Sequence, residues 1–334
     1  MLYREKLEQA KLFKEEYLAG FDRVIKQRQA EHLVLRSEYI KDIFHDQERY
    51  RNELKALIGW PLCQPREGVP ETRFTLLSEE DTHTLYRVSF EILDDLWMTG
   101  LFFKAEGTHP LVLVQHGGEG TPEGISNLYG TTYNYHHMLE RVIQHGVHAF
   151  APQLLLWKEE THQVNYNRDT IDASLKRLGS SVAAVELYGI QRIMDYFEQT
   201  DYVSTFGMVG LSYGGFYTMH TSALDPRIRS AISCAHFNTR DWFPWPSMTW
   251  FGEAEKFDDA EIACLSYPRP LCLLIGDHDD LFTPEGGLWS GERLKELCGD
   301  KLEQFITFAT YNGGHEFCKE DRYIEKLIQD LTAE

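Results

Sequence analysis

Long apolar runs are absent from this chain of 334 residues. No run approaches the roughly 18 consecutive apolar residues that mark a membrane-spanning helix, so no such span is predicted. The first segment, MLYREKLEQAKLFKEE, is charged from its fourth residue and lacks the apolar stretch of a secretory leader. From these two absences we expect a cytoplasmic protein without a membrane partner.

Cysteines are few and scattered. No two are spaced as Cys-x-x-Cys, and no histidines accompany them at zinc-site spacing, which excludes the common zinc and thioredoxin-like motifs. Cys272 lies in the apolar run LCLLIG, where a cysteine behaves as a small hydrophobic residue. We therefore expect free thiols in a reducing compartment at Cys63, Cys234, Cys264, Cys272, Cys298 and Cys318.

Positive charge is in short supply. The chain has 33 basic and 52 acidic residues, a net charge of −19. Such a field repels the phosphates of nucleic acids and anionic lipid surfaces, so neither is an expected partner. Hydrophobic residues at 43% and charged residues at 25% are ordinary for a globular protein, and no segment is of low complexity. One catalytic domain with an N-terminal addition is the predicted organisation.

Proline is absent before Pro61. The preceding residues are rich in Lys, Glu, Gln, Arg and Leu, with apolar side chains at helical spacing, which predicts helix, in two pieces. A connection punctuated by proline and glycine follows. We therefore divide the chain into a helical extension, 1–71, and a catalytic domain, 72–334. The helices are expected to pack on that domain; a contact between copies in a homo-oligomer is the alternative.

Two kinds of strand follow. Between residues 72 and 105, RFTLL, TLYRVSFEIL and WMTGLFFKA alternate as antiparallel strands do. Later apolar runs are continuous, which suits parallel strands covered on both faces. Helical stretches such as 182–199 separate them, so an α/β layered fold is predicted. The continuous runs are 111–115, 147–153, 206–211, 228–235, 270–276 and 305–310.

The strongest local signal is GLSYGG, which directly follows the strand run FGMVGL and contains Ser212. The pattern G-x-S-x-G between a strand and a helix is a nucleophile elbow, whose glycines permit a very sharp turn. The turn lifts the serine hydroxyl to the start of the next helix, where free N–H groups favour developing negative charge. Ser212 is the predicted nucleophile; a glycine-rich turn without catalytic function is the alternative.

A second glycine-rich loop, His116-Gly117-Gly118-Glu119-Gly120, follows the strand run LVLVQ. It resembles the oxyanion-hole loop of the α/β-hydrolases. The N–H of Gly117 or Gly118 would join the N–H of Tyr213 to hold the oxyanion, and losing one such donor costs about 3 kcal/mol of transition-state stabilisation. His116 precedes the nucleophile, whereas the base comes last in this fold. We therefore assign His116 to the hydrogen bonds of the loop, and we count it among the residues expected to bind substrate.

The acid and the base are predicted at the ends of two later strands. PLCLLIG leads into Asp279, and FITFAT leads into His315. A carboxylate after a strand lies on the rim where α/β sheets place their sites. Asp280 and Asp277 are second choices for the acid, and an acidic turn that caps a helix is the alternative. The order serine, acid, histidine is the chain order of α/β-hydrolases.

These residues predict acyl transfer. His315 would remove the proton of Ser212, the alkoxide would attack an acyl carbon, and water would then hydrolyse the acyl-enzyme. Asp279 would fix the tautomer of the imidazole. This chemistry requires no metal and no organic cofactor, and the adjacent pair His136-His137 would diverge on a helix.

From about residue 105 to 334 the chain resembles the dienelactone hydrolase and acetyl xylan esterase-like branch of the α/β-hydrolases. It is also similar to the catalytic domain of the prolyl oligopeptidases. GLSYGGF is similar to the elbow of both, and LLIGDHDDLFTP to the acid loop of the oligopeptidases, which places the acid at Asp279. The resemblance implies a mostly parallel central sheet with helices on both faces. It also implies a serine esterase acting on small molecules, acetylated or carbohydrate-derived esters among them.

Several departures weigh against a peptidase. Where the oligopeptidases carry an arginine that holds the substrate carbonyl, this chain has Leu281. About a hundred residues precede LVLVQ, too few for a β-propeller, and no paired-glutamate helix is evident. A prolyl oligopeptidase-like peptidase acting on short peptides is the alternative to the esterase. A catalytically silent hydrolase used for binding is a further alternative, against which stand the retained triad and elbow glycines.

Clues to the substrate are fewer. The segment 236–251 carries Trp242, Trp245 and Trp250 on the loop side of the sheet, where they could wall an acyl or sugar pocket. Ordinary aromatic packing is the alternative. A second loop, 153–180, holds Arg168 and Arg177. Arg177 could meet a substrate carboxylate, with a structural salt bridge as the alternative.

Overall fold

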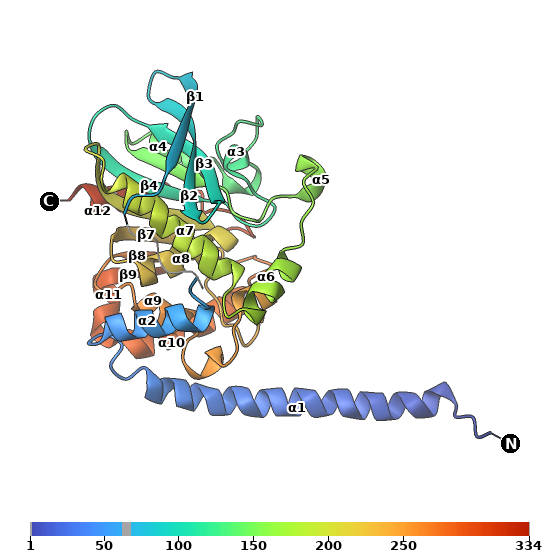
Figure 1. The fold of residues 1–334 in the computed structure, drawn as a ribbon. Helices are drawn as coiled ribbons and strands as arrows, with labels where there is room; N and C mark the ends of the chain where they lie inside the picture. Colours follow the sequence, from blue (N-terminus) through green and yellow to red (C-terminus); the bar gives the residue numbers. More distant parts are fainter. Residues whose placement is uncertain (1, 62–67, 334) are drawn as a thin grey trace.

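The computed structural model describes residues 2–61 and 68–333, and its centre is one sheet (Figure 1). The strand order is β1-β2-β3-β5-β4-β6-β7-β8-β9. The first three strands pair antiparallel, β3 pairs antiparallel with β5, and the remaining neighbours are parallel, so the predicted mixed sheet is confirmed. The strands are β1 (Thr72–Glu79), β2 (Thr84–Leu93), β3 (Leu96–Lys104), β4 (His109–Gln115), β5 (His148–Pro152), β6 (Val203–Leu211), β7 (Ile228–Cys234), β8 (Leu271–Gly276) and β9 (Ile306–Tyr311).

Helices cover both faces of this sheet. Successive residues of a strand point to opposite faces, and in β4 they divide between two apolar cores. One core takes side chains from α2, α7, α8, α9 and α10; the other takes them from α3, α4 and α12. The helices are α1 (Leu7–Tyr39), α2 (Gln47–Ile58), α3 (Pro122–Ile125), α4 (Met138–Ile143), α5 (Glu159–His162), α6 (Arg168–Arg177), α7 (Val182–Phe197), α8 (Tyr213–Leu224), α9 (Asp259–Cys264), α10 (Pro284–Cys298), α11 (Leu302–Phe305) and α12 (Arg322–Thr332).

The two predicted N-terminal helices are present, but they differ in how they pack. Helix α2 buries Tyr50, Leu54 and Ile58 in the core that also contains α7 and α8. Helix α1 buries only Arg36, and its N-terminal part projects away from the rest of the molecule (Figure 1). The expected packing on the catalytic domain is therefore found for α2 and for the C-terminal end of α1, but not for the projecting part.

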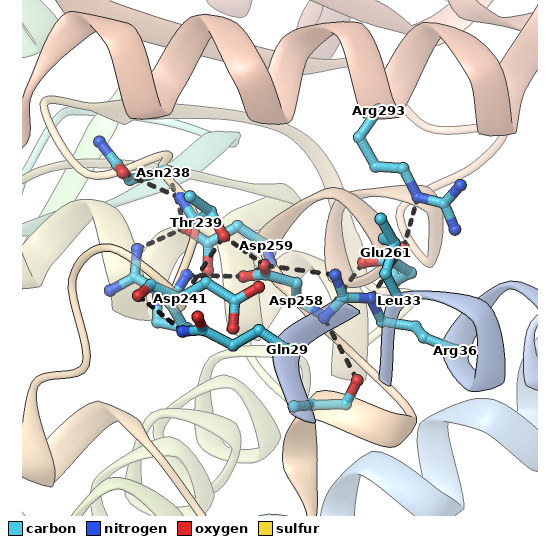
Figure 2. A network of polar contacts seen from close by, with 12 residues as sticks. Gln29, Leu33, Arg36, Asn238, Thr239, Asp241, Asp258, Asp259, Glu261 and Arg293 are labelled. Atoms are coloured by element: carbon cyan, nitrogen blue, oxygen red, sulfur yellow. Dashed lines mark hydrogen bonds and ion pairs between the residues drawn. The ribbon is translucent and has the colours of Figure 1, made fainter. Parts of the chain in front are cut away.

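A polar network anchors that C-terminal end (Figure 2). The guanidinium of Arg36, 2% exposed, lies 3.4 Å from the Glu261 carboxylate and 3.7 Å from that of Asp258, and it donates to the Ala254 carbonyl at 3.3 Å. About two turns earlier, the Gln29 amide donates to the Asp241 carbonyl. These polar contacts, together with the packing of the Tyr39 ring on Tyr50 and Phe257, fix this helix to the body.

Two findings bear on earlier expectations. Among residues 2–61 and 68–333, no helix combines the length and the apolar character needed to cross a bilayer. The cysteines at 234, 264, 272, 298 and 318 are free thiols, as expected. Cys63 and most of the predicted connection before residue 71 lie outside the described residues.

Candidate active site

The predicted catalytic side chains follow strands that run parallel to one another. In the register of the sheet, Gln115 at the end of β4 pairs with Gly210 of β6, and Gly276 of β8 pairs with Tyr311 of β9. The segments after these strands therefore leave the sheet at the same edge. They carry the 116–120 loop, Ser212, Asp279 and His315.

The turn between β6 and α8 has the geometry of a nucleophile elbow. Ser212 has φ +61° and ψ −122°, a strained conformation for a residue with a side chain. Its N–H donates to the Cys234 carbonyl at 2.9 Å, which holds the turn against β7. A Cβ on Gly214 would lie 2.2 Å from the Gln115 carbonyl oxygen, so this position accepts only glycine. The glycine pattern in the sequence is thus a requirement of close packing.

Asp279 and His315 form a hydrogen-bonded pair. The Nδ1 of His315 lies 2.9 Å from the Oδ2 of Asp279, whose Oδ1 accepts from the N–H groups of Leu281 and Phe282. The carboxylate is 3% exposed, and the ring of Phe282 stacks on the imidazole at 5.6 Å. These contacts hold the imidazole with Nδ1 toward the acid and leave Nε2 for other partners.

The nucleophile and the base are not hydrogen-bonded in this structure. Ser212 is 6% exposed, and none of the described residues forms a hydrogen bond with its hydroxyl. Catalytic hydrogen bonds are often long in ligand-free enzymes and shorten only when substrate binds. Transfer of the Ser212 proton to His315 is therefore part of the proposed mechanism.

The structure distinguishes between the two oxyanion donors that the sequence offered. The N–H of Gly117 donates to the Tyr135 hydroxyl at 2.9 Å and is therefore engaged. The N–H groups of Gly118 and Tyr213 have no acceptor among the described residues. The backbone of Gly118 lies beside the ring of Tyr213, since a Cβ on Gly118 would be 3.4 Å from it. Gly118 and Tyr213 are the available pair.

Comparisons with known proteins address the fold. No family model matches the chain. The glucuronoyl esterase from Solibacter usitatus superposes with a TM-score of 0.64 at 14% identity, covering 88% of this chain and 94% of that one. Acetyl xylan esterase 1 from Thermoanaerobacterium superposes with a TM-score of 0.55 at 15% identity, covering 86% and 94%. The chain has the α/β-hydrolase fold.

A comparison of sequences adds one relative. The protein named putative hydrolase YtaP, from Bacillus subtilis, is 28% identical over 145 residues. The match covers 40% of this chain and 44% of that protein, so the chain aligns with less than half the length of its relative.

His116 serves the loop of this α/β-hydrolase fold and does not reach solvent. It is fully buried: Nδ1 lies 2.9 Å from the Gly117 carbonyl oxygen, and Nε2 accepts from the Leu154 N–H at 3.1 Å. Burial lowers the pKa of the imidazole to about 4, so the ring is neutral. Both ring nitrogens therefore have partners within the protein, as expected for a residue that supports the loop. The expectation that His116 also contacts substrate does not agree with its complete burial.

The three predicted tryptophans occupy different environments. Trp245 packs on the ring of Tyr213 at 5.0 Å and on Phe282 at 6.1 Å, beside the elbow and the acid–base pair. Trp250, partly buried, stacks on the core residue Phe216 of α8. Trp242 lies against Trp289 in a groove between α1 and α10. Only Trp245 is near the candidate catalytic residues.

A buried network beneath the elbow was not predicted as such. The Arg168 guanidinium pairs with Glu186 at 3.0 Å, donates to the Tyr217 hydroxyl at 2.8 Å, and lies 5.4 Å from the centre of the Tyr213 ring. Burial lowers the pKa of Arg168, but the Glu186 carboxylate outweighs it and raises the value well above its usual range. These residues belong to α6, α7 and α8, so no local motif could reveal the network.

Arg177, the predicted carboxylate ligand, ends α6 and is exposed, and no described contact brings it to the site. Within residues 2–61 and 68–333, no group of three or more His, Cys, Asp or Glu side chains could hold a metal ion.

Proposed function

We propose that this protein is a serine esterase that cleaves carboxylic esters of small molecules through an acyl-enzyme on Ser212. The observation that carries the proposal is the Asp279–His315 hydrogen bond, which lies at the sheet edge where the strained turn presents Ser212. The cytoplasmic location predicted from the sequence remains part of this proposal.

In this mechanism each residue has one task. His315 accepts the proton of Ser212, and the oxygen attacks the acyl carbon. Asp279 stabilises the imidazolium that forms, and it is itself held as a carboxylate acceptor by two backbone N–H groups. The N–H groups of Gly118 and Tyr213 hold the oxyanion. His315 then returns the proton to the leaving alcohol, and water repeats the sequence to release the acid.

Acetylated or carbohydrate-derived esters are the favoured substrate class. Structures of similar fold include an acetyl xylan esterase and a glucuronoyl esterase. The partly exposed rings of Trp245 and Phe243, which pack on the buried Phe282, form an aromatic wall that suits a sugar ring or a short acyl chain. Leu281, at the position of the oligopeptidase arginine, is 39% exposed and offers no donor to a peptide carbonyl from its side chain.

A direct test uses p-nitrophenyl acetate and a fluorophosphonate probe on the full chain. The wild type should hydrolyse the ester and be labelled at Ser212, as mapped by peptide mass. Ser212→Ala should lose both, with a rate reduction of about 10³-fold or more. Ser174→Ala, which changes an exposed serine of α6, is the matched control and should behave as wild type. Equal rates for wild type and Ser212→Ala would contradict the proposal.

A substrate panel separates the esterase from the peptidase alternative. Short-chain acyl esters should be turned over faster than proline-containing aminoacyl amides. Faster turnover of the amides would reverse the assignment. A failure to hydrolyse either class, without labelling by the probe, would favour the catalytically silent alternative.

A further inference from the structure

The projecting part of α1 exposes a series of apolar side chains (Figure 1). We call residues 7–28 the arm. None of its residues is buried. Its apolar side chains are between 50% and 86% exposed at the six positions of what we call the stripe: Leu7, Tyr17, Leu18, Phe21, Val24 and Ile25.

The stripe lies along one side of the helix. Its last five members are spaced i, i+1, i+4, i+7 and i+8, and Leu7 precedes Leu18 by three turns, so they share a face. Tyr17 and Phe21 already touch edge to face, with ring centres 5.0 Å apart. At 3.6 residues per turn, Ile25 is within about 40° of Gln29 and Arg36, which contact the body. The apolar side of the arm therefore continues the anchored side of the helix.

A helix whose apolar face is exposed lacks the packing that stabilises most helices in proteins. Most helical stability in proteins comes from packing an apolar face rather than from helix propensity. The six exposed side chains leave roughly 600 Å² of apolar surface on each arm, and a pair of arms would bury about 1,200 Å², the lower limit of stable interfaces. Packing against a second arm would thus bury enough apolar surface for a stable interface.

The distribution of charge favours a second copy of this chain over a membrane. Residues 2–28 contain seven basic and five acidic side chains, whereas the whole chain has 33 and 52. Residues 2–28 therefore carry a small positive net charge in a chain of net charge −19, so two arms meet without the strong repulsion that two acidic bodies would exert. Membrane-surface helices carry a polar face rich in Lys and Arg, but here both signs are interspersed, as on the flanks of paired helices.

We propose that the arm is a self-association element through which two copies of this chain pair, stripe against stripe, about a two-fold axis. A two-fold axis brings the same patch of both copies together, so a single self-complementary stripe suffices. The proposal does not depend on the esterase activity.

The test measures the mass of the full chain in solution by light scattering across a concentration series. The wild type should have twice the 38.8 kDa of one chain. The variant with both Leu18→Glu and Phe21→Glu should have the mass of one chain, with a dissociation constant raised at least about thirtyfold. Leu12→Glu is the matched control, since Leu12 is 67% exposed on the same arm but outside the stripe, and it should remain paired.

Other outcomes would overturn the proposal. A wild type with the mass of one chain at all concentrations would do so, as would a stripe variant that pairs like the wild type. Stripe-dependent sedimentation with phosphatidylserine vesicles by a wild type of single-chain mass would assign the arm to a membrane instead. Far-ultraviolet circular dichroism and the urea midpoint of the body should be alike in both variants, which excludes misfolding as the cause.

Discussion

Three aspartates follow β8 within four residues, and the structure gives them different surroundings. Asp279 is buried and bonded to His315, whereas Asp277 and Asp280 are exposed. Asp277 accepts from the Gly313 N–H and so supports the turn that precedes the histidine. All three carry the same charge, so charge alone could not show which of them is the candidate catalytic acid. Burial and hydrogen-bond partners do.

We therefore predict unequal effects of the same substitution. Asp279→Asn should lower kcat for p-nitrophenyl acetate by about 10³-fold or more, because the amide favours the wrong imidazole tautomer and cannot stabilise the imidazolium. Asp280→Asn should keep kcat within about threefold of wild type, because its side chain is exposed. Steady-state kinetics on both purified variants measures this difference. A greater loss in Asp280→Asn would move the acid to that position.

A second residue-scale prediction concerns the aromatic wall. Trp245 packs on Tyr213, whose N–H is a proposed oxyanion donor. Trp245→Ala should lower kcat/KM for acetylated sugars by about tenfold, since an aromatic contact contributes about 0.5–1.5 kcal/mol beyond its buried area. Trp242→Ala removes a ring of the same type next to α10 and should leave kcat/KM unchanged. Matching losses in both variants would indicate a structural effect instead of a binding one.

At this scale the sequence predicted residue types well and side-chain roles less well. The elbow glycines and the Asp279–His315 pair follow from motifs whose geometry is fixed by the strand ends. Whether the N–H of Gly117 is free depends on Tyr135, a partner 18 residues later on another segment. The Arg168–Glu186 pair likewise joins two helices. Such contacts are set by tertiary packing, which spacing along the chain does not encode.

At the scale of elements, the end of α1 is fixed by a buried cluster of carboxylates. Glu261 and Asp258 are 0% and 3% exposed, and burial raises the pKa of Glu261. Arg36 and Arg293 supply the opposite charge at 3.4 Å and 3.0 Å from Glu261. A buried ion pair stabilises little beyond an apolar pair, but its disruption leaves an uncompensated charge.

Removing Arg36 should therefore cost more than removing an exposed cation of the same helix end. Arg36→Ala should lower the free energy of unfolding by about 3 kcal/mol, the lower part of the range for a broken buried pair, because Arg293 remains. Lys41→Ala, which loses an exposed pair with Glu38, should change it by less than about 0.5 kcal/mol. Urea unfolding of both variants gives the two values, and equal values would refute the anchoring role of Arg36.

The presence, type and order of the elements were the more predictable part of the fold. The six apolar runs became β4 to β9. For β4 to β8 the reason is that a strand covered on both faces needs apolar side chains at successive positions. The edge strand β9 differs, because Thr307 and Thr310 are exposed. The N-terminal helices were also predictable from spacing. That α2 joins the core while the arm projects was not, since both carry exposed and apolar positions, and the difference depends on what each meets in space.

The whole molecule buries several ionisable groups outside the candidate site, and these link its stability to pH. His220 of α8 is 1% exposed, with its ring 3.9 Å from that of Phe216 and 6.3 Å from that of Trp250. Burial lowers its pKa to about 3, and the Arg240 charge acts in the same direction. Buried carboxylates have the opposite effect on the pH dependence of stability. Burial raises the pKa of Asp259 to about 7, so this group favours the folded state at low pH rather than at high pH. The dependence of the free energy of unfolding on pH therefore sums contributions of both signs. The contribution of His220 is measured best by comparing the wild type with a variant that lacks this histidine.

His220→Phe isolates that contribution. In the unfolded chain a histidine binds a proton below about pH 6.5, whereas folded His220 stays neutral down to about pH 3. Its effect is thus fully favourable above pH 6.5, and it is lost as the pH falls toward 3. Between pH 6 and 4 the wild type should lose about 1.4 kcal/mol per pH unit more than the variant. Urea unfolding across that range tests this, and parallel stability curves would mean that His220 becomes protonated in the folded protein.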